Sequence, residues 1–245
     1  MSFDEFFSTG LIPRFIADNN IGTTGFVYVL LMILTVVCST VVPYLLGSIN
    51  FSIIISKKQY NEDIRDYGSG NAGMTNMMRT YGSKAAALTL VGDALKAVIS
   101  GFIGYAVFGQ FGAYVAGLFC IIGHMFPVFY KFRGGKGVVT AAASILVCNP
   151  FVFLICLVIF VIIVLFTRYI SLGSVMCVLL YPVILNRIDK LFFEVEAMGY
   201  HLIAILMALL IVYKHKENIK RLINGTESKF SFKKSKKSED TKDAK

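Results

Sequence analysis

The chain has 245 residues, of which 56% are apolar and only 16% are charged, and its formal net charge is +9. Soluble domains carry roughly 25% charged residues, so this composition excludes an ordinary soluble protein and indicates one that lies in a membrane. The positive charge does not indicate a nucleic-acid partner, because the basic residues flank apolar stretches instead of forming a basic face with interleaved aromatic residues.

Residues 1–24 precede the first apolar stretch and do not resemble a signal peptide, since their charges are mixed and Pro13 interrupts them. We expect a short interfacial helix there, at the outer face. Seven apolar segments then predict an all-α, polytopic bundle of about seven spans. They are residues 26–53, 85–108, 112–130, 137–149, 151–167, 170–187 and 198–213.

Two proline positions predict irregularities in these spans. Pro43 lies inside the long first segment, where we expect a kink. Asn149-Pro150 predicts a turn between the fourth and fifth segments, although one long helix or a re-entrant pair would also fit that region.

The distribution of Lys and Arg predicts the orientation. Twenty of the 24 basic residues lie in the connections after the first, third and fifth spans or beyond residue 213. We therefore expect the N-terminus outside and the C-terminus in the cytoplasm, with residues 25–226 as the membrane domain. Residues 227–245 are rich in Lys and Ser, which predicts a disordered basic tail that is attracted to anionic lipid.

The first polar segment, YGSGNAGMTNMMRTYG at residues 67–82, has the composition of a phosphate-binding loop. Its glycines, which include Gly70 and Gly73, permit turns in which successive N–H groups face an anion. Side-chain donors come from Ser69, Asn71, Thr75, Asn76 and Arg79. The spacing matches neither a Walker loop nor a dinucleotide fingerprint, and a flexible polar loop is the alternative.

The second polar segment is GHMFPVFYKFRGGKG at residues 123–137. His124 lies near the end of the third span, and a glycine turn with basic side chains precedes the fourth, which is a phosphate-binding arrangement. The turn consists of Arg133, Gly134, Gly135, Lys136 and Gly137. A basic stop-transfer loop would explain the charge but not the glycines.

Two further places carry unusual polar residues. Asp93 and Lys96 are ionisable groups three residues apart inside the second span, where such groups are either functional or form a structural ion pair. RYISLGS at residues 168–174, which contains Ser171, and KHKENIKRLINGTE at residues 214–227 lie on the predicted cytoplasmic side. The second of these places His215, Asn218 and Arg221 at helical spacing, although a basic helix lying on lipid headgroups would show the same pattern.

These motifs together resemble the PlsY family of acyl-phosphate:glycerol-3-phosphate acyltransferases of bacterial membranes. The similarity runs from GSINFS at residues 47–52 to Glu227 and includes SGNAGMTN and GHMFPVFYKFRGGKG. Three positions depart from the family pattern: Asn50 replaces a frequent proline, Lys214 replaces an arginine, and Ala142 lies in a segment that often contains glycine.

The resemblance implies acyl transfer from acyl phosphate to glycerol 3-phosphate at the cytoplasmic side of the bacterial cell membrane, without metal or other cofactor. It implies a phosphate site on the first loop, a second at Lys136 and its glycine turn, and contacts from Ser48, His215 and Asn218 to glycerol phosphate. His124 or the donor's own phosphate would deprotonate the hydroxyl. Expected partners are the two substrates, membrane lipids and the peripheral enzyme that makes acyl phosphate.

Features of other enzyme classes are missing from the sequence. There is no GxSxG elbow, and no histidine has an aspartate five positions later, because residues 129, 206 and 220 are Phe, Leu and Lys. A transporter of organic phosphates should instead show inverted repeats or midplane breaks. A structural membrane protein would leave the glycine loops unexplained.

Overall fold

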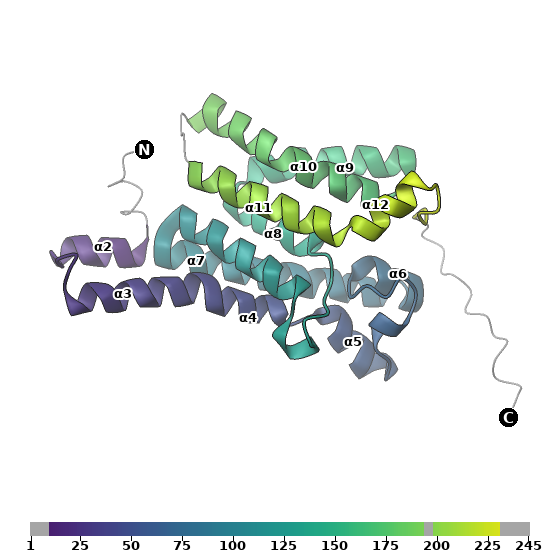
Figure 1. Ribbon diagram of the computed structural model, residues 1–245, viewed down its shortest axis with the longest axis horizontal. Coiled ribbons are helices and arrows are strands. Elements are labelled where there is room, and N and C mark those ends of the chain that lie inside the picture. The colour runs from purple at the N-terminus through teal and green to yellow at the C-terminus, as the bar shows by residue number, and fades with distance from the viewer. Residues whose placement is uncertain (1–9, 194–197, 231–245) are drawn as a thin grey trace, which may run out of the picture.

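The computed structural model describes residues 10–193 and 198–230, and every regular element in these ranges is a helix. The predicted all-α class is therefore confirmed. In Figure 1 the helices lie side by side in a bundle, and three short ones gather at one end of it. These are α5 (Phe51–Tyr60), α6 (Met74–Tyr81) and α12 (Lys216–Ile223).

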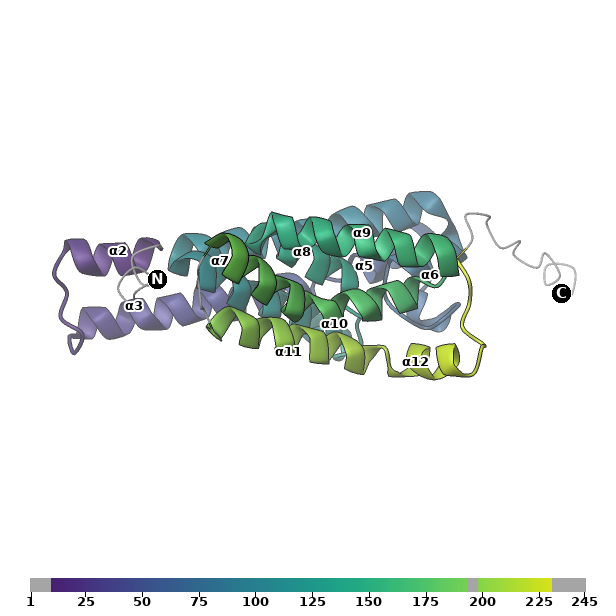
Figure 2. The ribbon, with the colours of Figure 1, turned by 90° about the horizontal axis from the view of Figure 1, so that it is seen from above.

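The N-terminal segment forms a short helix, α2 (Leu11–Asp18), which the sequence predicted within residues 1–24. Residues 1–9 lie outside the described part of the chain. Gly10 touches the backbone at Phe108 and Gly109, since a methyl group added to it would lie 2.6 Å from the Gly109 nitrogen. Figure 2 shows α2 and the helix after it extending beyond the rest of the bundle.

The first apolar segment is an interrupted helix. It comprises α3 (Phe26–Val36), a π-helical turn η1 (Val37–Val41), α4 (Val42–Ser48) and, after Ile49 and Asn50, α5. The irregularity expected at Pro43 takes the form of the π turn that ends just before it, because a proline offers no N–H to the preceding turn. The Asn50 side chain caps α5 by accepting a 3.3 Å hydrogen bond from the Ile53 amide.

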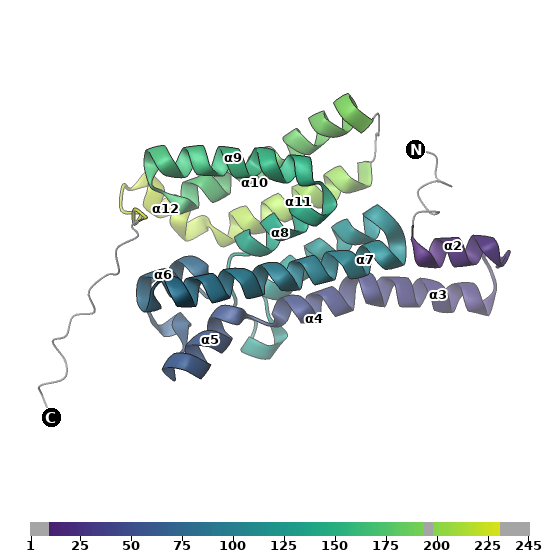
Figure 3. The same cartoon turned by 180° about the vertical axis from the view of Figure 1, so that it is seen from behind.

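The longest element, α7 (Ser83–Met125), is two helices that reverse direction at Phe108 and Gly109. Gly109 has φ 59° and ψ −153°, a conformation open essentially to glycine alone. The two halves meet at Gly104 and Gly112, where a methyl group on either residue would lie 2.1 Å from the other's carbonyl oxygen. Figure 3 shows the ribbon doubling back at this point, and the halves correspond to the predicted spans 85–108 and 112–130.

The C-terminal half contains α8 (Val138–Cys148), α9 (Pro150–Thr167), α10 (Ile170–Ile188) with its π-helical extension η4 (Asp189–Phe193), and α11 (Met198–Lys214). The turn predicted at Asn149-Pro150 separates α8 from α9, and the Asn149 side chain caps α9 through a 3.1 Å bond from the Val152 amide. One continuous helix in this region is thereby excluded. Helices α11 and α12 meet at a bend of 61°.

The number of membrane crossings and their orientation stay predictions. Four described segments are long and apolar enough to span a bilayer, and α11 with α12 would make a fifth. One of the four is the reversed helix α7, whereas α8 has 11 residues, about half the length that a span needs. These criteria therefore support a membrane protein without confirming seven spans.

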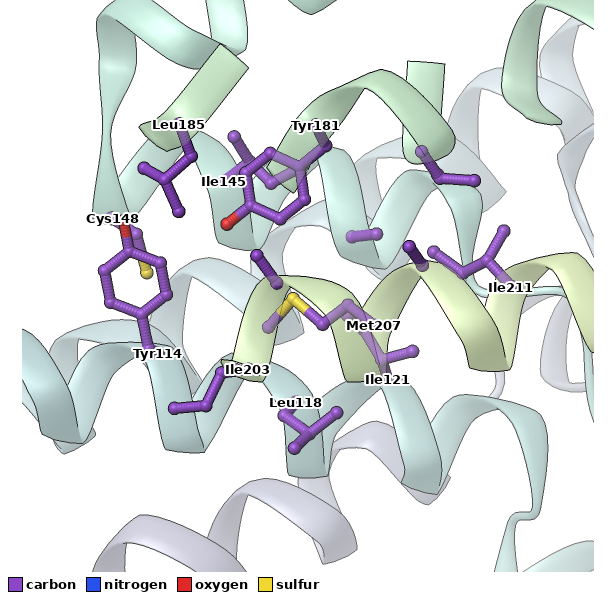
Figure 4. Close-up of a cluster of buried hydrophobic side chains, with 14 of the residues drawn as sticks. Tyr114, Leu118, Ile121, Ile145, Cys148, Tyr181, Leu185, Ile203, Met207 and Ile211 are labelled. Atoms are coloured by element: carbon purple, nitrogen blue, oxygen red, sulfur yellow. The ribbon is translucent and has the colours of Figure 1, made fainter. Parts of the chain in front are cut away.

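The main core lies between the second half of α7 and helices α8 to α11 (Figure 4). Tyr114, Ile121, Tyr181 and Met207 are among its most buried side chains. By contrast, α9 buries only Val152 and Cys156 and exposes large apolar side chains such as Leu165 and Phe166. An apolar outer face of this kind suits contact with lipid.

The contact between Gly104 and Gly112 yields a prediction about stability. Gly104→Ala should lower the thermal unfolding temperature in detergent, since the methyl group forces the α7 halves apart at a cost of about 1–3 kcal/mol. Gly22→Ala is the control, because no atom lies within 4 Å of the added methyl group. Equal unfolding temperatures for the two variants would show that the halves of α7 do not pack in this way.

Candidate active site

The glycine-rich loop of residues 67–82 is organised by the side chain of Asn76, which is 1% exposed. Its carbonyl oxygen accepts a 2.9 Å hydrogen bond from the Ser69 amide. Its Nδ2 donates to the carbonyls of Ile64, Tyr67 and Asn71 at 3.2, 2.9 and 3.1 Å. The predicted contact of Asn76 with substrate is therefore replaced by a structural role, because all its polar atoms hold the loop.

The loop presents other side chains to solvent. Gly68 adopts φ +58° directly over Asn76, where a methyl group would lie 2.3 Å from Oδ1. Ser69 and Gly70 are exposed, and Asn71, Gly73, Thr75 and Arg79 are partly exposed. Within the described part of the chain, the hydroxyls of Ser69 and Thr75 and the guanidinium of Arg79 make no hydrogen bond or ion pair, so they can receive an anion.

The Gly134–Gly137 turn packs on the end of α7. The amides of Gly134 and Gly135 donate to the carbonyls of Met125 and His124 at 3.3 and 3.1 Å. A methyl group on Gly134 would lie 2.0 Å from the His124 carbonyl oxygen. These two amides are thus engaged within the protein, which corrects our expectation that the turn offers them to a phosphate.

Lys136 projects from this turn toward α12, where its ammonium donates to the Asn218 side-chain oxygen. Burial is the main cause that lowers the pKa of Lys136 to about 8; the charge of Glu227 opposes this shift, and those of Arg221 and Arg79 contribute to it. Arg79 and Arg221 are therefore close enough to Lys136 for their charges to lower its pKa. Figures 1 and 2 both place α6, which carries Arg79, and α12 at the same end of the bundle.

The segment after α11 supplies an acidic residue that the sequence analysis did not assign to the site. Glu227 accepts 2.7 Å hydrogen bonds from Asn218 Nδ2 and Arg221 Nε. Burial raises the pKa of Glu227, but these two bonds and Ser171 outweigh it and hold the pKa below its ordinary value. The sequence predicts a disordered tail from residue 227 onward, whereas Glu227 itself makes these contacts; residues 231–245 lie outside the described part of the chain.

Two of the predicted residues near this cluster are buried. His215 is 3% exposed, and its Nδ1 lies 2.8 Å from the Ile211 carbonyl oxygen. Ser171 is 7% exposed, at the start of α10. Lys136 and Glu227 both act on the ring of His215, so it lies beside the same cluster without being open to solvent.

For three other predicted residues, no side-chain hydrogen bond or ion pair to a member of this cluster is found among the described residues. Ser48 is 0% exposed and donates to the Tyr44 carbonyl oxygen at 2.9 Å within α4, and its expected contact with substrate stays a prediction. Arg133 is exposed, and its carbonyl rather than its side chain is bound within the protein. His124 is 4% exposed, and Lys96 and Asp93 lie beside its Nδ1.

The pair expected between Asp93 and Lys96 is present, with 2.8 Å between Nζ and Oδ1. His124 joins it as a third member, which helical spacing does not reveal because His124 lies in the other half of α7. Both side chains are only 3% exposed, and this burial supports the interpretation of Asp93 and Lys96 as a structural ion pair.

Arg65 joins the two glycine loops. Its Nη1 donates to the carbonyl oxygens of Tyr130 at 3.0 Å and Arg133 at 3.1 Å. Asp63 holds the guanidinium through contacts of 2.9 and 2.7 Å. The hydrogen bond and charge of Arg65 outweigh burial and lower the pKa of Asp63 to about 2. We refer to Asp63 and Arg65 with these two carbonyls as the loop tether.

The chemical character of the cluster is that of an anion site. Lys136, Arg79 and Arg221 supply positive charge, Asn218 an amide, and Ser69 and Thr75 hydroxyl groups. Within the described residues, no group of three or more His, Cys, Asp or Glu side chains could hold a metal ion. Cations and neutral donors that converge beside an apolar bundle suit a phosphate-bearing amphiphile.

The chain is similar to known membrane proteins over most of its length. The profile of the family described as "Glycerol-3-phosphate acyltransferase" matches residues 37–225. A glycerol-3-phosphate acyltransferase of Finegoldia magna is 43% identical over 205 residues, which cover 82% of this chain and 97% of that protein.

Two solved structures of PlsY (YgiH), an integral membrane glycerol 3-phosphate acyltransferase, are also similar. The glycerol 3-phosphate form has a TM-score of 0.73 and 36% identity, and covers 80% of this chain and 96% of its own. The lysophosphatidic acid form has a TM-score of 0.70 and 34% identity, and covers 81% and 96%.

The hydrogen bonds of Asn76 yield a prediction about the loop. Asn76→Ala removes four bonds, each worth about 0.5–1.5 kcal/mol, so the Ser69 amide should exchange its hydrogen much faster and anion binding should weaken. Hydrogen exchange followed by mass spectrometry measures this, with Asn186→Ala in α10 as the control. Unchanged exchange across residues 64–72 would contradict the organising role of Asn76.

Proposed function

The chain belongs to the glycerol-3-phosphate acyltransferase family, and on that premise we propose that it transfers a fatty acyl group from acyl phosphate to the 1-hydroxyl of sn-glycerol 3-phosphate. The products are 1-acyl-sn-glycerol 3-phosphate and inorganic phosphate, as in the first acylation step of phospholipid biosynthesis. The observation that carries the proposal is the contact between Lys136 and Asn218, with Arg79 and Arg221 around it.

Both substrates carry a phosphate, and the cluster offers two groups of donors for them. In our proposal Arg79, with the hydroxyls of Ser69 and Thr75, binds one phosphate. Lys136 and Asn218 bind the other, and His215 and Ser171 shape the wall beside them. Gly137, at φ +79°, starts α8 immediately after Lys136, so the positive end of that helix adds to the attraction.

Glu227 has a supporting role in this arrangement. It binds Asn218 through one carboxylate oxygen and Arg221 through the other, so it fixes the direction of both side chains. A carboxylate in a phosphate site would repel the substrate if it were free, but here one oxygen faces the Asn218 amide and the other the Arg221 guanidinium. The net charge of Lys136, Arg79, Arg221 and Glu227 remains positive.

The reaction itself needs no nucleophile from the protein, because acyl phosphate is a mixed anhydride and is already activated. The glycerol hydroxyl oxygen attacks the acyl carbon, the carbon–oxygen bond to phosphate breaks, and the departing phosphate accepts the hydroxyl proton. Lys136 stabilises the charge that grows on this phosphate. The burial of His124 and its contact with Lys96 favour the donor phosphate, rather than His124, as proton acceptor.

The location of the cluster suits a substrate that enters from the membrane. It lies at one end of a bundle whose outer faces are apolar, so an acyl chain can stay among lipid tails while its phosphate reaches Lys136. The basic connections support a cytoplasmic position for this end, with the N-terminus outside. A peripheral enzyme that makes acyl phosphate would then deliver the donor from the cytoplasm.

The choice of donor provides the main test of the proposal. Purified protein in lipid bilayers should convert acyl phosphate and glycerol 3-phosphate into lysophosphatidic acid and phosphate, and should give no product from acyl-CoA. The site is built from short loops and helix ends, and none of its described residues forms a separate domain for the adenine-bearing part of CoA. Comparable turnover with acyl-CoA would overturn the proposed donor.

The environment of Lys136 generates a second prediction. Lys136→Ala should lower the rate about a hundredfold or more, because it removes the ammonium that faces the leaving phosphate. Arg133→Ala is the matched control: it also removes a cation, but from an exposed side chain of the same loop. Similar losses in both variants, or near-normal turnover in both, would contradict the proposed role.

The same residue predicts the pH dependence. Because the pKa of Lys136 is lowered to about 8, the ammonium is present below that pH and is lost as the pH rises through it. The value of kcat/KM, which reports the free enzyme, should therefore fall above about pH 8. In Lys136→Arg the guanidinium stays protonated, so the kcat/KM of any residual activity should not fall above about pH 8.

A further inference from the structure

Lys96 is a buried cation for which the proposed reaction gives no role. Its ammonium lies 2.8 Å from Asp93 Oδ1, 2.9 Å from the Gly47 carbonyl oxygen, 2.7 Å from the Ile49 carbonyl oxygen and 2.9 Å from His124 Nδ1. The side chains of Lys96 and Asp93 are 3% exposed. A charge buried inside a span is a functional candidate, so each of these contacts needs an explanation.

Two of the contacts stabilise the break in the first apolar segment. Helix α4 ends at Ser48, so the nearby carbonyls of Gly47 and Ile49 have no helical donor from the next turn. Such carbonyls need a partner because the membrane interior contains no water. Lys96 supplies it, and the break is held against the first half of α7. This part of its role is structural.

The third contact determines the state of His124. An ammonium group only donates hydrogen bonds, so Nδ1 of His124 must be the acceptor and can carry no proton. The alternative partner is Asp93 Oδ1, but it lies 3.6 Å from Nδ1, beyond hydrogen-bond distance. The ring is therefore neutral with its proton on Nε2. His215 provides a contrast, because its Nδ1 faces the Ile211 carbonyl oxygen at 2.8 Å and must carry the proton.

The opposite edge of the His124 ring meets both glycine loops. A methyl group on Gly135 would lie 2.2 Å from His124 Nε2 and 2.4 Å from the Ala72 carbonyl oxygen. The Gly135 amide also donates to the His124 carbonyl oxygen. His124 thus lies where the first loop, through Ala72, meets the second, through Gly135, and Lys136 is the next residue.

We propose that Lys96 is a positioning residue: by holding His124 as the Nε2–H tautomer, it sets the distance between the two glycine loops and so the place of Lys136. The kinetic part of this inference rests on the proposed function, but the tautomer does not. It also follows that His124 cannot accept a proton from a substrate hydroxyl, because Nε2 is already protonated and the bare Nδ1 accepts from Lys96.

The tautomer can be measured directly by ¹⁵N NMR of the full-length protein in detergent, with labelled histidine. The chain has three histidines, and spectra of His201→Gln and His215→Gln assign the signals. We expect His124 to show a protonated Nε2 and a bare Nδ1, and His215 the reverse. A proton on Nδ1 of His124, alone or with one on Nε2, would overturn the proposal whether or not the protein is active.

A paired substitution tests the consequence for binding. Lys96→Met with Asp93→Ala removes both charges together, since a lone buried carboxylate would destabilise the fold. We expect a folded protein whose His124 shows both tautomers and whose KM for acyl phosphate rises about tenfold or more, with a smaller change in kcat. Lys84→Met, exposed on the same helix, is the control and should match the unmodified protein.

The outcomes separate this inference from the proposed function. A folded double variant with an unchanged KM and an unchanged His124 signal would overturn the positioning role. If the double variant does not fold, the ¹⁵N spectrum of the unmodified protein decides whether His124 has the proposed tautomer. An unmodified protein without transferase activity but with the expected tautomers would overturn the proposed function and leave the Lys96–His124 relation supported.

Discussion

Close backbone contact along α7 is the constraint on which the rest of the structure depends. Methyl groups added at Gly47 and Gly123 would each lie 2.1 Å from a carbonyl oxygen, that of Cys120 and that of Tyr44 respectively. Helix α4 and the second half of α7 therefore cross with almost no side chains between them, as helices in membranes do where small residues permit it. The Gly134–Gly137 turn, which carries Lys136, packs against the end of this half of α7.

Polar side chains from two other helices bind the backbone at the end of α7, next to this crossing. Tyr44 donates to the Phe126 carbonyl oxygen at 2.9 Å, and Lys214 donates to that of Met125 at 3.1 Å. The end of α7 is thus held from both sides of the bundle, by α4 and by α11. A turn anchored in this way can keep Lys136 in one place while the outer faces of the helices contact fluid lipid.

The sequence predicted well the features that depend on local patterns. Hydropathy located both halves of α7, Asn149-Pro150 located the end of α8, and the spacing of Asp93 and Lys96 predicted their contact. The roles of individual polar residues were harder to predict, because an amide that binds substrate and one that braces a loop have the same chemistry. Asn76 was assigned to the substrate for this reason, although all its polar atoms are engaged inside the protein. Glu227 was missed because its contact with Arg221 depends on the turn at Gly225, whose φ of +68° a sequence does not show.

The loop tether has a consequence for acidic conditions. The pKa of Asp63 is held near 2, so the contact with Arg65 is fully present above the ordinary aspartate value of 3.8 and is lost only as the pH falls through about 2. A phosphate monoester, by contrast, changes from a dianion to a monoanion near pH 6, where its second pKa lies. Mild acidification therefore changes the charge of a phosphate ligand while the two loops stay joined, so weaker phosphate binding at about pH 5 to 6 would come from the ligand's ionisation and not from loss of the site's geometry.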